Sequence, residues 1–183
     1  SLKEKSPSCT VAILEKGMFP SGASTKNAGF ACFGSLTEIT DDLSVMTQEE
    51  VISLVDLRLK GLELLISRLG KEAIEFKLDG GYEVITDEEY NTGKNITMVN
   101  DMLTDVFGQR CFGFANEQIP EFGFAGKNIK DLVFTQFEGQ LNTGKMMQAL
   151  QDLGSLNGIS YFTNTEVISF EENDQGVKLS TNQ

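Results

Sequence analysis

The stretch VAILEKGMFPSGASTKNAGFACFGS, residues 11–35, decides how the rest of the sequence is interpreted. A short aliphatic run over Thr10–Glu15 is typical of a β-strand, and it ends in an acid with Gly17 close behind. Residues 19–30 are rich in glycine, serine and alanine. We expect them to form neither helix nor strand, because small and turn-forming residues favour irregular backbone.

An acid at the carboxyl end of a buried strand is the position at which a dinucleotide-binding fold holds an adenosine ribose. The carboxylate of Glu15 suits this task because it can accept hydrogen bonds from both ribose hydroxyls. The small residues of the loop allow close approach to a ligand, and its backbone N–H groups suit a phosphate. A charged strand end and a flexible surface loop would explain the same residues without a ligand.

Composition excludes several kinds of function. The 183 residues carry 15 basic and 27 acidic side chains, a net charge of −12, and no histidine. We therefore expect no nucleic-acid partner and no catalysis or metal binding through histidine. Three cysteines, Cys9, Cys32 and Cys111, are odd in number and far apart, which favours free thiols in a reducing cytoplasm. No apolar run approaches the ~20 residues of a transmembrane segment, and the polar N-terminus resembles no signal peptide.

Capping signals predict the helices. Thr47 and Glu50 have the spacing of a capping box, which predicts a helix over residues 48–69 that ends at Gly70. Its apolar residues recur at helical spacing, so we expect Val51, Val55, Leu62 and Leu69 to be buried on one face. Ser35 and Glu38 repeat that spacing before a shorter helix. Thr86 with Glu89 would cap a helical stretch that is interrupted near Gly93 and resumes from Ile96 to a stop at Gly108. A further helix should begin at Asn142 or Thr143 and end at Gly158.

Strands are expected in three places. Residues 73–78 and 82–86 flank the turn Asp79–Gly81 and suggest a β-hairpin. Residues 110–137 suggest short strands with turns, and residues 159–170 and 177–181 suggest two more strands. Gly139–Lys145 also matches the phosphate-loop pattern G-x-x-x-x-G-K, but Met146 stands where magnesium needs a hydroxyl. We therefore interpret this segment as an ordinary helix start.

Residues 11–35 resemble the flavin-dependent amine and amino-acid oxidoreductases, a family that includes glycine oxidase, D-amino-acid oxidase and dehydrogenase, and sarcosine oxidase. Residues 138–181 also resemble that family, in which a helix leads to a strand whose T-x-V residue holds adenine through its backbone. The resemblance implies FAD as cofactor. It implies that the cofactor-binding residues are Glu15, Lys16, Ala23, Ser24, Thr25, Ala28, Gly29, Phe30 and Val167.

The implied fold class is α/β, or α+β within a fragment. Residues 1–45 and 140–183 would belong to a Rossmann-like FAD-binding domain, and residues 46–139 to an antiparallel-sheet substrate domain. The implied function is oxidation of a small amine or amino acid by hydride transfer to the flavin, followed by hydrolysis of the imine. No catalytic residue is assigned. Tyr82, Tyr90 and Arg110 are the side chains to inspect for a carboxylate clamp or pocket wall.

The family's G-x-G-x-x-G turn occurs nowhere in the chain. We therefore expect an internal fragment that holds no FAD by itself, because the pyrophosphate would normally rest on the helix after that turn. The strand at residues 10–15 should have one open edge, which could drive self-association. Two alternatives remain: a non-catalytic acidic α/β interaction module, and an FAD-dependent hydroxyacid oxidase of the same fold.

Overall fold

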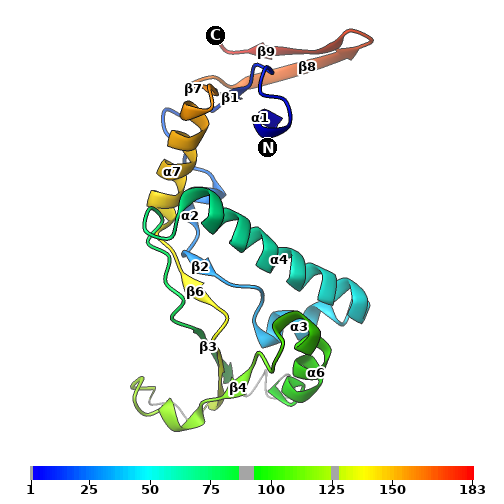
Figure 1. Ribbon diagram of the computed structural model, residues 1–183, viewed down its shortest axis with the longest axis vertical. Helices are drawn as coiled ribbons and strands as arrows, with labels where there is room; N and C mark the ends of the chain where they lie inside the picture. The colour runs from blue at the N-terminus through cyan, green and yellow to red at the C-terminus, as the bar shows by residue number, and fades with distance from the viewer. Residues whose placement is uncertain (1, 87–92, 125–127) are drawn as a thin grey trace. The chain divides into compact units, whose positions relative to one another are not determined.

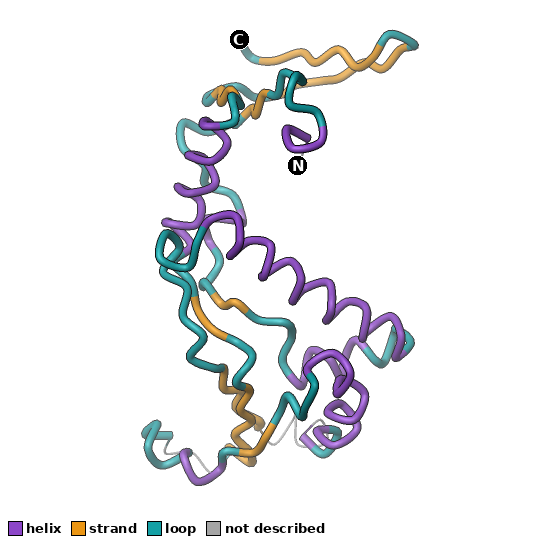
Figure 2. The backbone as a smooth tube through the Cα atoms, in the orientation of Figure 1, coloured by secondary structure: helices purple, strands orange, loops and turns teal. Residues whose placement is uncertain are grey.

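The computed structural model describes residues 2–86, 93–124 and 128–183. It divides into two compact units: unit 1 comprises Ser1–Ala28 and Asn142–Gln183, and unit 2 comprises Gly29–Leu141 (Figure 1). Residues 29–45 therefore belong to the same compact unit as the middle of the chain. The mixture of helices with small parallel and antiparallel sheets is the expected α/β class, and Figure 2 shows how these elements alternate along the chain.

Two helices of unit 2 begin at the predicted caps. Helix α3 (Leu36–Asp42) starts at Ser35, whose side chain accepts the Glu38 N–H. Helix α4 (Gln48–Leu69) starts with a complete Thr47–Glu50 capping box and ends at Gly70. Helix α6 (Ile96–Phe107) ends at Gly108, which adopts the left-handed conformation expected of a glycine there. The predicted cap at Thr86 depends on Glu89, which lies outside the described residues.

Unit 2 also contains two antiparallel sheets. In one, β5 (Ile129–Thr135) lies between β3 (Gly81–Thr86) and β4 (Gly113–Phe114), and the 3₁₀ helix η1 (Asn116–Gln118) follows β4. In the other, β2 (Phe30–Ala31) pairs with β6 (Gly139–Gln140).

The predicted hairpin at residues 73–86 is wrong. The strand β3 exists, but its partner is β5, about fifty residues further along the chain. Lys77 instead forms an isolated bridge with Gln140, and the Glu138 backbone carbonyl accepts the Gly80 N–H. A turn motif thus predicted a local pairing, whereas burial of the β3 side chains against β5 decided the partner.

The core of unit 2 forms where α3, α4 and α6 meet the strands. Val51 and Val55 are fully buried, as predicted, but Leu62 and Leu69 in the second half of α4 are only half-buried. The helical spacing of the apolar residues predicted which face of α4 is buried, but it did not predict that burial decreases toward the C-terminal end of the helix. The core cluster consists of Phe33, Leu36, Ile39, Val51, Val55, Ile85, Ile96, Val99, Leu103, Cys111, Phe112 and Val133.

One buried polar side chain organises this core. The Asn100 amide donates to the Phe112 carbonyl at 2.9 Å, and its Oδ1 accepts the N–H groups of Cys111 and Phe112 at 2.9 and 2.8 Å. These bonds satisfy the backbone that leads from α6 into β4, which would otherwise be buried without partners.

Unit 1 is built on the parallel pair β1 (Ala12–Leu14) and β7 (Ser160–Phe162). Helix α7 (Thr143–Leu156), capped by the Asn142 side chain, precedes β7, as predicted. The chain then enters the hairpin of β8 (Val167–Asn173) and β9 (Gly176–Thr181), also as predicted. A single turn of helix, α1 (Leu2–Lys5), lies near the N-terminus.

The expectation that residues 19–30 are wholly irregular is wrong. Ala23–Lys26 form the one-turn helix α2, and Phe30 begins β2. The Thr25 hydroxyl donates to the Gly22 carbonyl at 2.9 Å, and the Thr143 hydroxyl contacts the Asn27 side chain at 2.9 Å. Side-chain bonds and contact with α7 therefore order a stretch whose composition favours a loop.

No helix in the described ranges is both long and apolar enough to cross a membrane.

Candidate functional site

Glu15 lies directly after β1, at the carboxyl end of the parallel strand pair. Its backbone N–H donates to the Phe162 carbonyl at 2.8 Å, which continues the pairing with β7. Its half-buried carboxylate accepts the Gly17 N–H through Oε1 at 2.7 Å. The carboxyl edge of parallel strands is where α/β sheets bind ligands, and a carboxylate there has acceptor capacity left after one hydrogen bond.

The predicted adenine-side segment lies next to Glu15. The Thr165 N–H donates to the Glu15 carbonyl at 2.9 Å, and Val167 begins β8 two residues later. Lys16 forms an exposed salt bridge with Glu166 at 2.6 Å, and this hydrogen bond raises the pKa of Lys16. The structure therefore brings Glu15, Lys16 and Val167 together, although about 150 residues separate them in the sequence.

The small-residue segment places Ala23, Ser24 and Thr25 in α2 and Ala28 just beyond it. Ala23, Ser24 and Ala28 are exposed, whereas Thr25 is half-buried and uses its hydroxyl to hold the Gly22 carbonyl. The Thr25 hydroxyl therefore orders its own helical turn.

Gly29 and Phe30 belong to unit 2. Gly29 is buried with a φ of 80°, a conformation that favours glycine, and its carbonyl accepts the Leu141 N–H at 2.8 Å. Phe30 is 78% exposed at the start of β2. Its side chain lines a pocket that lies wholly within unit 2.

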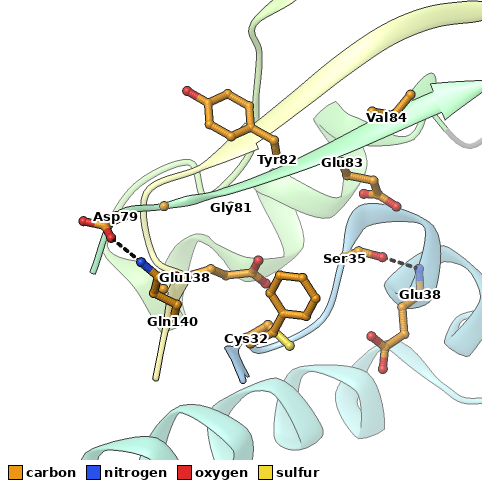
Figure 3. Close-up of a pocket in the computed structure, with 13 residues that line it drawn as sticks. Cys32, Ser35, Glu38, Asp79, Gly81, Tyr82, Glu83, Val84, Glu138 and Gln140 are labelled. Carbon is orange, nitrogen blue, oxygen red and sulfur yellow. Dashed lines mark hydrogen bonds between the residues drawn. The ribbon is translucent and has the colours of Figure 1, made fainter. Parts of the chain in front are cut away.

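This pocket has a volume of about 670 Å³. One wall is the segment from β2 to the start of α3, and the opposite walls are the start of β3 and the β5–β6 connection (Figure 3). Tyr82 and Glu83 project to opposite sides of β3, as successive strand residues must, so Glu83 turns toward Ser35 (Figure 3). The residues that line the pocket are Phe30, Cys32, Ser35, Glu38, Asp79, Gly80, Gly81, Tyr82, Glu83, Val84, Glu138, Gly139 and Gln140.

Two of the acids in this pocket already have strong partners. Glu83 accepts the Leu36 N–H at 2.8 Å, the Thr37 N–H at 3.2 Å, and the Thr37 hydroxyl. Its charge is thus stabilised by the first N–H groups of α3. Glu38 forms a salt bridge with Arg58 at 2.8 Å, and Arg58 also donates to the Phe33 carbonyl at 3.0 Å.

Glu138 differs from these acids. Its Oε1 is buried and has no hydrogen-bond partner among the residues that the structure describes. Burial, with smaller contributions from the negative charges of Glu83 and Glu38, raises the pKa of Glu138 from 4.5 to about 7. The backbone N–H groups of Phe33 and Gly34 act in the opposite direction without outweighing burial. Glu138 can therefore change its protonation state near neutral pH.

The described cysteines are free, as predicted. The Cys32 residue is exposed, yet partial desolvation of its thiol and the nearby charge of Glu138 raise its pKa. Burial raises the pKa of Cys111 to about 12. Neither thiol is poised as a thiolate nucleophile at neutral pH.

The three residues predicted as a carboxylate clamp or pocket wall are Tyr82, Arg110 and Tyr90. Tyr82 lines the pocket and donates its hydroxyl to Gln118 at 2.8 Å, and its ring contacts Phe122 and Phe134. Arg110 is exposed and does not line the pocket. Tyr90 lies outside the described residues. Sequence reasoning missed Glu138, because nothing local marks an acid whose special character comes from burial beside Phe33 and Gly34.

Comparison with known proteins identifies the family. The family model described as FAD dependent oxidoreductase (DAO) matches residues 2–183. The chain belongs to this FAD-dependent oxidoreductase family. No curated protein matches it.

Solved structures of this oxidoreductase fold resemble the chain at low sequence identity. Glycine oxidase from Geobacillus kaustophilus matches 94% of the chain at 22% identity with a TM-score of 0.65. L-amino acid deaminase from Proteus vulgaris matches 99% at 16% identity with a TM-score of 0.68. L-proline dehydrogenase from P. horikoshii matches 94% at 18% identity with a TM-score of 0.58. The chain spans 45%, 40% and 42% of those three chains, respectively.

The residues of this family member fit the adenosine part of FAD. Glu15 presents its carboxylate oxygens at the carboxyl edge of β1 and β7, and among the described residues the Gly17 N–H donates to one of them, which leaves acceptor capacity of the kind that ribose hydroxyls need. The neighbouring segment at Thr165–Val167 supplies backbone groups beside the same edge. The donor chemistry in unit 1 therefore agrees with the cofactor that the family name states.

Proposed function

We propose that the protein is an FAD-dependent oxidoreductase that oxidises an amine or amino acid. The observation that carries this proposal is the family match over residues 2–183. The structural relatives support the substrate class, because their names are glycine oxidase, L-amino acid deaminase and L-proline dehydrogenase. Bound FAD would accept a hydride from the substrate α-carbon, and the resulting imine would hydrolyse.

The two units have separate roles in this proposal. Unit 1 contributes to the FAD-binding domain: Glu15 binds the ribose, the backbone of Val167 meets adenine, and residues 23–25 lie along the pyrophosphate. Unit 2 contributes to the substrate domain, and Gly29 and Phe30 border the flavin ring. The open pocket in unit 2 supports this division, because substrate sites are concave and combine apolar walls with a few polar groups.

Removal of the Glu15 carboxylate tests the FAD assignment. In the full-length gene product, Glu15→Ala should weaken FAD binding by about ten- to a hundredfold, since a charged hydrogen bond is worth ~1.5–3 kcal/mol. Titration of apo-protein with FAD measures this. Glu171→Ala is the matched control, because Glu171 is an exposed acid on β8 in the same unit.

An unchanged affinity in Glu15→Ala would show that Glu15 is only a charged strand end. Anaerobic mixing of the FAD-loaded protein with amines, amino acids and hydroxy acids tests the reaction. Bleaching of the flavin by an amine or amino acid supports the proposal, whereas bleaching by hydroxy acids alone would favour a hydroxyacid oxidase. The 183-residue chain itself should retain no FAD, because the sequence has no G-x-G-x-x-G turn.

A further inference from the structure

We propose that Glu138 is a catalytic base: its carboxylate binds the ammonium group of the substrate amine and takes one of its protons. This inference rests on the proposed function and deepens it. It assigns the residue that prepares the amine for oxidation, and it predicts that the pocket in unit 2 prefers a cationic amine to an anionic ligand.

The position of Glu138 follows from strand register. It immediately precedes β6, and the pairing of Ala31 with Gly139 places it across from Cys32. Phe30 and Cys32 line the same pocket as Glu138. Gly81 leaves the space that the Glu138 carboxylate occupies, since a Cβ on Gly81 would collide with that carboxylate. The two sheets of unit 2 thus hold this acid against the β2 segment, which the proposed function places beside the flavin.

Elimination identifies Glu138 among the acids of the pocket. Glu83 is committed to the N–H groups of α3, and Glu38 is committed to Arg58. Asp79 accepts a hydrogen bond from the Gln140 amide at 3.0 Å. The backbone N–H groups of Phe33 and Gly34 hydrogen-bond the Glu138 carboxylate, whereas its Oε1 is buried without a partner among the described residues. A carboxylate in this state gains more from an incoming cation than the other three would.

The charges around Glu138 favour a cation. Glu83 on β3 and Glu38 on α3 face it with negative charge, and Arg58 on α4 is already paired with Glu38. The Cys32 thiol on the β2 side is neutral at physiological pH, because its pKa is raised. No lysine or arginine is among the lining residues described for this pocket. A carboxylate ligand would therefore meet repulsion where an ammonium group meets attraction.

The proton transfer is balanced. The substrate R–NH₃⁺ and the Glu138 carboxylate become R–NH₂ and the Glu138 carboxylic acid, so one N–H bond breaks and one O–H bond forms. Only the neutral amine has the lone pair that assists loss of hydride from its α-carbon. A base whose pKa is about 7 is matched to this task at neutral pH, and the chain has no histidine to perform it.

Calorimetry on the 183-residue chain tests the assignment without turnover. Benzylammonium chloride is titrated at pH 7 in two buffers that differ in ionisation enthalpy, with sodium benzoate as the anionic probe. Benzylammonium should bind at least tenfold more tightly than benzoate. Binding should release about half a proton, since a group with pKa near the working pH is half protonated before the cation arrives.

Three variants separate charge from folding. Glu138→Gln keeps the shape of the side chain and should lose the proton release and at least tenfold in affinity. Glu138→Asp keeps the charge and should restore part of both. Glu117→Gln removes an exposed acid of unit 2 that does not line the pocket, and it should bind like the wild type. Circular dichroism verifies that each variant is folded.

The proposal is overturned if neither probe binds, if benzoate binds as well as benzylammonium, or if Glu138→Gln keeps both affinity and proton release. The experiments distinguish failure of the Glu138 assignment from failure of the proposed function. If the full-length protein binds FAD and oxidises amines while the calorimetry fails, only the assignment of Glu138 is wrong. If the calorimetry succeeds while the full-length protein takes no FAD, the proposed function is wrong.

Discussion

The two units bury their apolar residues to very different extents. All members of the core cluster lie in unit 2, between Phe33 and Val133. Among the described residues of unit 1, only Gly154 is buried, and the apolar side chains Ile168, Phe170 and Leu179 of the β8–β9 hairpin are at least half exposed. Both units therefore contain helices and strands, but the core cluster of buried apolar side chains lies in unit 2.

The helices α4 and α7 illustrate this difference. Both begin at a side-chain cap, and both carry apolar residues at helical spacing. On α4 the residues Val51 and Val55 reach the core, whereas on α7 the tight contact occurs where the Tyr161 ring lies against Gly154. We infer that unit 2 supplies most of the free energy of unfolding, and the following substitutions test this comparison.

The largest effect is expected in the core of unit 2. Leu103→Ala should lower the free energy of unfolding by about 2–5 kcal/mol, because Leu103 is completely buried and its loss leaves a cavity. Urea unfolding followed by circular dichroism measures this. Leu179→Ala in unit 1, where the side chain is 50% exposed, should cost below about 1 kcal/mol. Equal costs in the two variants would contradict the comparison.

A smaller loss is expected when the buried amide is removed. Asn100→Ala should destabilise the protein by about 2–3 kcal/mol, since it leaves backbone groups of Cys111 and Phe112 buried without partners. Asn157→Ala is the matched control in unit 1, because Asn157 is exposed and bonds only to the end of its own helix. The same urea titration compares them, and a control as costly as Asn100→Ala would contradict the prediction.

The smallest effect should depend on pH. The pKa of Glu138 is about 7 in the folded state and near 4.5 in the unfolded state. Between pH 4.5 and pH 7 the folded state therefore binds more protons than the unfolded state, and the free energy of unfolding falls as pH rises through this range. Glu138→Gln removes this loss. Relative to wild type, the free energy of unfolding of the variant should rise by about 1–2 kcal/mol between pH 5 and pH 8. This is less than the full pKa difference implies, because solvent screens a partly exposed carboxylate.

Thermal unfolding of both proteins at pH 5, 6, 7 and 8 follows the difference. The gain should still be rising at pH 7, where wild-type Glu138 is half ionised, and should level off toward pH 8 and above as ionisation is completed. A constant difference across this range would mean that the Glu138 carboxyl has no raised pKa, and Glu117→Gln provides the pH-independent reference.

Local signals predicted the helices well. The caps at Ser35, Thr47 and Asn142 and the stops at Gly70 and Gly108 lie where the sequence placed them, because each depends on contacts within a few residues. The cofactor family was also accessible from residues 11–35, and the family match confirms it. The sequence failed where contacts are distant: β3 pairs with β5, and contact with α7 orders α2.

The sequence by itself determined the helix boundaries, the strands of unit 1 and the relation to FAD-dependent oxidoreductases, since these depend on short-range capping, alternation and a contiguous motif. Only the tertiary structure decided the partner of β3, the half-burial of Leu62 and the burial of Glu138 Oε1 without a partner among the described residues. Burial and electrostatic surroundings come from residues that are far apart in the chain. Glu138 is chemically one acid among 27 until folding places it beside Phe33, Gly34 and Glu83.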